Sequence, residues 1–100
     1  MSERALQLGR TFLTAGNYAA AIEAAEEVLG EAPENDEAWA LLHRAVEHQS
    51  GKKEALKIAE KWISIMPESR GALLCLAVDI IALRKVKHRI KELPASYVSH

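Results

Sequence analysis

The chain has 100 residues, of which 49% are hydrophobic and 27% are charged, so its length and composition fit one globular domain with its own core. The net charge of −1 argues against a general attraction to nucleic acid or to an anionic membrane surface. The single Cys75 excludes an internal disulfide, and no apolar run approaches the roughly 18 residues of a membrane span. We therefore expect a cytoplasmic protein that binds neither nucleic acid nor membrane.

Two helices are predicted in the first third of the chain, over residues 3–15 and 18–29. Apolar residues recur there at the spacing of one helix face. Gly16 and Asn17 separate the two helices, and Pro33 prevents the second from continuing. The inward stripe of the first helix is predicted to consist of Ala5, Leu8, Phe12 and Leu13.

A second pair of helices is predicted over residues 36–49 and 52–65, and Pro67 ends it. Asn35 and Ser69 stand just before a predicted helix and have side chains that can accept a hydrogen bond from its first turn, so we predict that they are N-caps. The inward residues of this pair are predicted to be Trp39, Leu42, Val46, Leu56, Ala59, Trp62 and Ile63.

The third unit differs, because no second helix of the same kind follows its first. Residues 70–93 are predicted to form one long helix, or a helix with a kink near Arg84, since no glycine marks a turn there. The basic run over residues 84–91 would give the end of the structure a charged outer face that caps it. The inward residues are predicted to be Leu73, Leu76 and Ile80, and residues 94–100 form a tail.

A shift of 34 residues superimposes the two helix pairs, and it places Ala21 on Ala55 and Pro33 on Pro67. Small residues at such positions let two helices approach to about 8–10 Å. In these residues, together with Trp39, the chain resembles the tetratricopeptide repeat family. The resemblance implies an all-α superhelix of antiparallel helix hairpins with about five helices. It also implies one domain over residues 1–93, with repeats over 2–35 and 36–69 and a partial, capping repeat over 70–93.

In this family the first helix of each hairpin lines a concave groove that holds a protein partner. The resemblance therefore implies a non-catalytic interaction module, a scaffold or adaptor, that binds a peptide or a partner helix. At positions that line the groove in this family, the chain has, among others, Leu6, Leu41, Gly71 and Cys75. The residues that we predict to bind the partner are Arg10, Leu13, Arg44, Glu47, His48, Leu74, Val78 and Ile81.

The third unit is apolar on nearly every side, because Leu74, Val78 and Ile81 cannot all be inward together with Leu73 and its stripe. One interpretation is that the tail, over residues 94–98, or a second copy of the chain covers it, the latter forming a homodimer. A second is that it forms an apolar groove for a peptide. A third is a contact to a further domain.

No catalytic residue, metal site or cofactor site is predicted. His43 and His48 are five positions apart and do not share a helix face. Cys75 has apolar neighbours, which favours an inert, buried thiol. The glycines are isolated, so no phosphate-binding loop occurs.

Two polar residues stand out against this background. Asp79 interrupts an apolar stretch, and we expect a structural pair with Arg44 or Lys85. His43 departs from the family pattern, which has a small residue at this position. A histidine at a close helix contact is expected to tilt outward or to push the helices apart.

An alternative function is the N-terminal recruiting domain of a larger enzyme. Residues 94–98 read Pro-Ala-Ser-Tyr-Val and are similar to the junction that leads into the catalytic domain of bacterial methyltransferases carrying such repeats. No part of a methyl-donor site occurs in the 100 residues, so we expect no catalysis by this chain itself.

Overall fold

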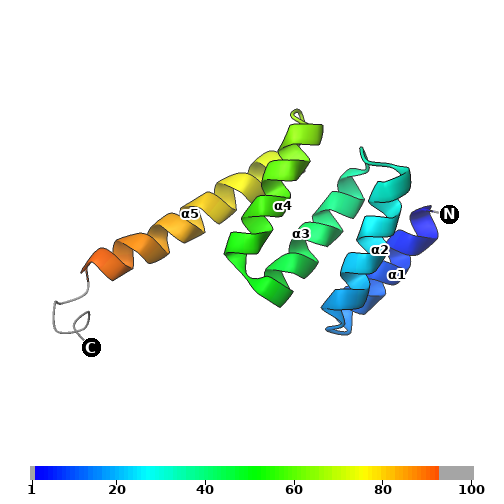
Figure 1. Cartoon of the computed structure of the whole chain (residues 1–100), viewed down its shortest axis with the longest axis horizontal. Helices are drawn as coiled ribbons and strands as arrows, with labels where there is room; N and C mark the ends of the chain where they lie inside the picture. The colour runs from blue at the N-terminus through cyan, green and yellow to red at the C-terminus, as the bar shows by residue number, and fades with distance from the viewer. Residues whose placement is uncertain (1, 93–100) are drawn as a thin grey trace.

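The computed structural model describes residues 2–92, with the side chains of residues 3–84. This part of the chain contains five helices and no strand (Figure 1). The all-α fold is thereby confirmed, and the predicted helices are found with their ends shifted by at most two residues. The helices are α1 (Ser2–Thr14), α2 (Tyr18–Glu31), α3 (Asp36–Ser50), α4 (Lys52–Ile65) and α5 (Arg70–Glu92).

Short polar segments begin the helices as predicted. The Asn35 side chain accepts a hydrogen bond from the backbone N–H of Ala38 (3.1 Å), and Ser69 Oγ accepts one from Ala72 (3.1 Å). Both N-caps are therefore confirmed. Gly51 makes the tight turn between α3 and α4 with a φ of 91°. A residue with a side chain would be strained in this backbone conformation.

Successive helices pack side by side as an antiparallel series (Figure 1). The odd-numbered helices also contact one another, α1 with α3 and α3 with α5, whereas α2 and α4 have no such contact within the described residues. The stack is therefore closed on the side of α1, α3 and α5 and splayed on the side of α2 and α4. The first side is the concave one.

Small residues and two tryptophans form the core. Ala21 and Ala55, the pair related by the repeat, are both fully buried, as are Ala25 and Ala59. Trp62 is 1% exposed. The two helices of each hairpin therefore pack closely at the predicted alanines. A larger side chain at these positions would separate the helices.

The prediction of the inward stripe was wrong at several positions. Leu8 in α1 is 53% exposed, whereas Leu6 is buried. The reason is Gly9, at which an added Cβ would lie 2.5 Å from Leu41 Cδ2. Since Gly9 lets α1 approach α3 so closely, the face that carries Gly9 and Leu6 is buried, and Leu41 with it. Leu8, one position before Gly9, points away.

The same error occurs in α5. Leu73 and Ile80, predicted to be inward, are 50% and 37% exposed. The helix instead presents Ala72 and Asp79 to the core, both fully buried. Leu73 and Ile80 each follow one of these residues and are turned away by about 100°.

No helix in the described residues is both long enough and apolar enough to cross a lipid bilayer.

Candidate functional site

A hollow of about 450 Å³ lies on the concave side, between α1, α3 and α5. We call it the groove pocket. Seven of the eight predicted partner-binding residues line it, and they come from three helices: Arg10, Leu13, Arg44, Glu47, His48, Leu74 and Val78. Ile81, the eighth, is not among the lining residues and is 54% exposed further along α5. Leu41 and Cys75 also line the pocket.

A polar network, buried at Asp79 and His43 and partly exposed at Lys52 and Glu47, forms the floor of the groove pocket. Asp79 Oδ2 lies 2.7 Å from His43 Nε2, and Asp79 Oδ1 lies 3.5 Å from Lys52 Nζ. Lys52 Nζ is also 3.1 Å from Glu47 Oε2. The side chains of Asp79 and His43 are 0% and 7% exposed, so both groups lose their hydration when the chain folds. The contacts within the network replace that hydration.

The predicted pairing of Asp79 with Arg44 was therefore wrong. Arg44 is exposed on α3 and does not bind it, because the neighbouring His43 occupies the face that meets α5. The side chain of Lys85 lies outside the described part. His43 does not tilt outward as expected, since its ring is buried and reaches the carboxylate on α5.

The charges of the network shift the pKa of two groups, Lys52 within the network and Cys75 beside it. Burial lowers the pKa of Lys52, but the hydrogen bond and charge of Glu47 and the charge of Asp79 outweigh it, so the pKa is raised. Burial, followed by the charges of Asp79 and Glu47, raises the pKa of the Cys75 thiol. The thiol is therefore protonated at neutral pH and is a poor nucleophile, although Cys75 is half-buried at the pocket and not fully buried as predicted.

Three residues of the network are types that could hold a metal ion. The ligand atoms of His43, Glu47 and Asp79 all lie within 4.8 Å of one another. The Lys52 ammonium is already in contact with both carboxylates, at the place that a cation would take. We therefore interpret the cluster as an ion network. Sequence reasoning missed it: the four-residue spacing of His43 and Glu47 is visible in the sequence, but Asp79 joins them only in the fold.

The rim of the groove pocket carries both paired and unpaired charges. Arg10 on α1 forms an exposed ion pair with Glu37 at the start of α3. His48 stacks on Tyr18, with ring centroids 5.0 Å apart. Among the residues that the structure describes, Arg44 has neither an ion pair nor a side-chain hydrogen bond. Its guanidinium is thus the cation at the rim that is available to a partner.

Comparison with known proteins identifies the repeat. A family model described as tetratricopeptide repeat matches residues 12–77, which extends from the end of α1 into α5. The chain belongs to the tetratricopeptide repeat family. A comparison of this tetratricopeptide repeat chain with curated proteins gives no significant match. Repeats of this family generally mediate protein–protein interaction, and the family is typically non-catalytic.

Proposed function

We propose that this tetratricopeptide repeat protein binds a peptide segment of another protein in the groove pocket. The observation that carries the proposal is the unpaired Arg44 beside exposed apolar residues of α5: Leu74 is 66% and Val78 is 45% exposed. An exposed cation next to an apolar surface suits a segment that offers both a carboxylate and apolar side chains.

The other predicted partner-binding residues would have supporting roles. Leu13 would extend the apolar contact on the α1 side, and Ile81 would extend it along α5. Arg10 and Glu47 already have ion-pair partners, so a ligand must compete for them. His48 is held against Tyr18 and would offer a ring edge to the ligand. We therefore expect Arg44 and Val78 to contribute most to affinity.

The proposal can be tested with a displayed library of random peptides selected against the whole chain. Binding of the selected peptides would be measured by fluorescence anisotropy for Arg44→Glu and Val78→Asp. Arg70→Glu and Leu8→Asp are controls, because they introduce the same acidic side chains at exposed positions outside the groove pocket.

We expect each groove variant to weaken binding at least about tenfold, since each replaces an attraction by a repulsion or by a buried charge. Selected peptides should be rich in acidic and apolar residues. If both groove variants fold and bind every selected peptide as the parent chain does, the groove is not the binding site.

We further propose that α5 forms the contact of a homodimer. Leu73, Ile80 and Ile81 leave a large apolar surface exposed, and a two-fold axis can place such a surface on its own copy. Sedimentation at several concentrations would show a monomer–dimer equilibrium that Ile80→Asp shifts to monomer. A strict monomer at high concentration would contradict this proposal.

Recruitment to a larger enzyme remains a prediction. The segment over residues 94–98, on which the similarity to the methyltransferase junction depends, lies outside the described residues.

A further inference from the structure

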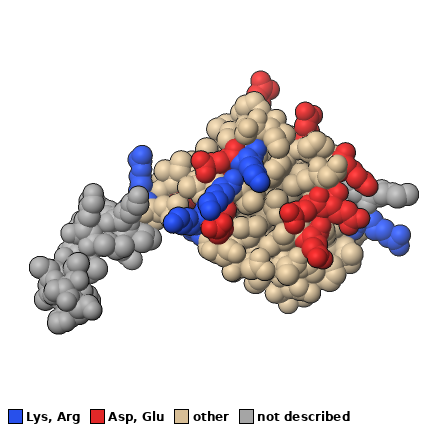
Figure 2. Space-filling model, in the orientation of Figure 1, with Lys and Arg blue, Asp and Glu red and all other residues tan. Residues whose placement is uncertain are grey.

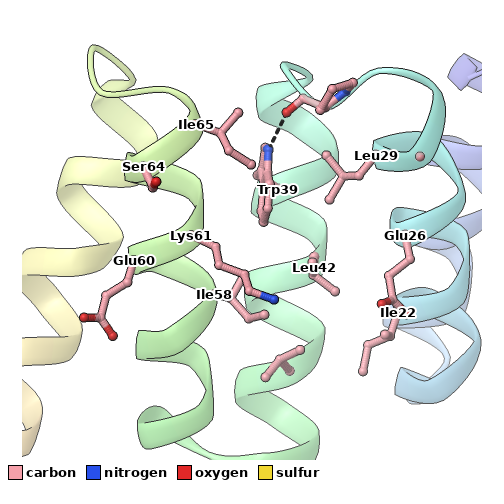
Figure 3. A pocket seen from close by; sticks show the side chains of 13 residues that line it. Ile22, Glu26, Leu29, Trp39, Leu42, Ile58, Glu60, Lys61, Ser64 and Ile65 are labelled. Carbon is pink, nitrogen blue, oxygen red and sulfur yellow. Dashed lines mark hydrogen bonds between the residues drawn. The ribbon is translucent and has the colours of Figure 1, made fainter.

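A second hollow lies on the opposite side of the repeat, between α2 and α4, with α3 beneath it (Figure 3). We call it the convex pocket, and its volume is about 780 Å³. It exists because α2 and α4 do not contact each other within the described residues, which leaves a hollow over α3, although Trp39 and Leu42 beneath it are only 5% and 6% exposed. None of the residues that line it lines the groove pocket.

The floor of the convex pocket is a regular apolar surface. Trp39, Leu42 and Val46 of α3 line it, and their spacing of three and then four residues places them along one helix face. The Trp39 indole donates a hydrogen bond to the Pro33 carbonyl (2.8 Å), which fixes the ring in the floor (Figure 3). Ile65 at the rim is 44% exposed.

The two walls carry different charges. Helix α2 contains four acidic residues and no basic one, and Figure 2 shows acidic side chains gathered over it. Helix α4 contains four lysines against two glutamates. Among the lining residues, Glu26 belongs to the α2 wall, whereas Lys61 extends from α4 across the pocket and Glu60 points away from it (Figure 3).

We propose that the convex pocket binds an amphipathic helix of a partner protein that carries basic residues along one flank of its apolar stripe and acidic residues along the other. Because Trp39 and Leu42 in the floor are nearly buried, the apolar stripe of the helix would pack mainly on the exposed Ile65 and on the half-buried apolar residues of the two walls, Ile22, Leu29 and Ile58. The basic flank would face Glu26 and the acidic residues of α2, and the acidic flank would face Lys61. This proposal is independent of the function proposed for the groove pocket.

Three synthetic helical peptides of about 18 residues, with the same leucine stripe, provide the probe. The first carries lysines on one flank and glutamates on the other, the second lysines on both flanks, and the third glutamates on both. Binding to the whole chain is measured by anisotropy of the labelled peptide. We expect the mixed peptide to bind about threefold to tenfold more tightly than either of the others.

Charge reversals in the two walls test the assignment directly. At the positions that line the pocket, Glu26→Lys gives both walls a lysine, so the peptide with glutamates on both flanks should become the tightest. At the same positions, Lys61→Glu leaves both walls with glutamates only, and the lysine peptide should become the tightest. Glu68→Lys and Lys53→Glu are matched controls at exposed positions that do not line the pocket, and the order of the peptides should stay as in the parent chain.

Three further measurements complete the test. Ile65→Asp should weaken the mixed peptide at least about tenfold, because it places a charge in the apolar contact. Arg44→Glu should leave this peptide unaffected, which separates the convex pocket from the groove pocket. The proposal is overturned if no peptide binds at millimolar concentration, if wall reversals leave the order unchanged, or if the pocket proves to be occupied by a second copy, shown by a dimer that Ile65→Asp dissociates.

Discussion

His43 Nε2 lies 2.7 Å from Asp79 Oδ2, and this contact joins α3 to α5 through two buried side chains. No other contact between two titratable side chains among the described residues has both partners buried. A carboxylate that is completely enclosed is tolerated only while its partners remain in place. The position of α5 on the stack therefore depends on polar groups as well as on apolar packing.

Removing one partner of this pair should be costly. We expect His43→Leu or Asp79→Leu to lower the free energy of unfolding by about 3–5 kcal/mol, because the first leaves the buried Asp79 with only the 3.5 Å contact to Lys52 and the second leaves the buried His43 ring without its hydrogen bond. The double variant should be less destabilised than the sum of the two single variants. Urea unfolding followed by circular dichroism gives all three values.

The exposed pair of Lys57 and Glu54 provides the control, and Lys57→Leu should change stability by less than about 1 kcal/mol. If His43→Leu cost no more than this control, the buried contact would not stabilise the fold.

Two glycines should respond in opposite ways to the same change. At Gly71 an added Cβ would lie 2.9 Å from Trp62 Cη2, and Trp62 cannot shift easily because it is buried and its indole N–H donates to Asp36. We expect Gly71→Ala to destabilise the protein by about 1–3 kcal/mol. At Gly30, in α2, nothing lies within 4 Å of the added Cβ, so Gly30→Ala should stabilise by about 0.5–1 kcal/mol.

Thermal unfolding of both alanine variants beside the parent chain measures these changes. A Gly71→Ala variant that is as stable as the parent chain or more stable would mean that the contact with Trp62 does not restrict Gly71.

The raised pKa of Cys75 predicts a slow reaction with alkylating agents. The pH profile of alkylation by iodoacetamide should have its midpoint above the ordinary value of 9.0 in the folded chain, and near that value in urea. Because the folded state keeps the thiol proton at a pH at which the unfolded chain has released it, Cys75 should lower stability as pH rises through 9.0 toward the folded pKa. A folded midpoint below 9.0 would contradict the assignment of burial as the main cause.

The cap of α5 should matter more than the cap of α2. Ser69 Oγ accepts from the Ala72 N–H and donates to Asp36 Oδ1 (2.7 Å), whereas the exposed Asn17 accepts one longer bond of 3.3 Å from Ala20. We expect Ser69→Ala to cost about 1–2 kcal/mol and Asn17→Ala about 0.5 kcal/mol. Equal losses in chemical denaturation would show that the bond to Asp36 contributes nothing.

Much of the fold could be predicted because its signals are local. The glycine, asparagine and proline breaks predict where the helices end, and Asn35 and Ser69 cap them through bonds three residues away. The equivalence of Ala21 and Ala55 predicted their burial, because a repeated small residue in a repeated hairpin meets the same neighbouring helix.

What could not be predicted depends on distances between helices. The buried side of α1 includes Leu6 rather than Leu8, since Gly9 permits an approach to Leu41 that no spacing within α1 reveals. For the same reason the candidate groove residues could be placed on their helices from the family pattern, whereas the hollow they share, and the absence of Ile81 from it, required coordinates.

The sequence by itself determined the helices, their caps and their repeat, because these depend on neighbours within a few positions. The tertiary structure decided which carboxylate meets which histidine and where the surface is hollow. Asp79 and His43 are 36 residues apart, and they form a pair only because α5 packs on the hairpin of α3 and α4. The convex pocket likewise results from the splay of α2 and α4, which no single helix encodes.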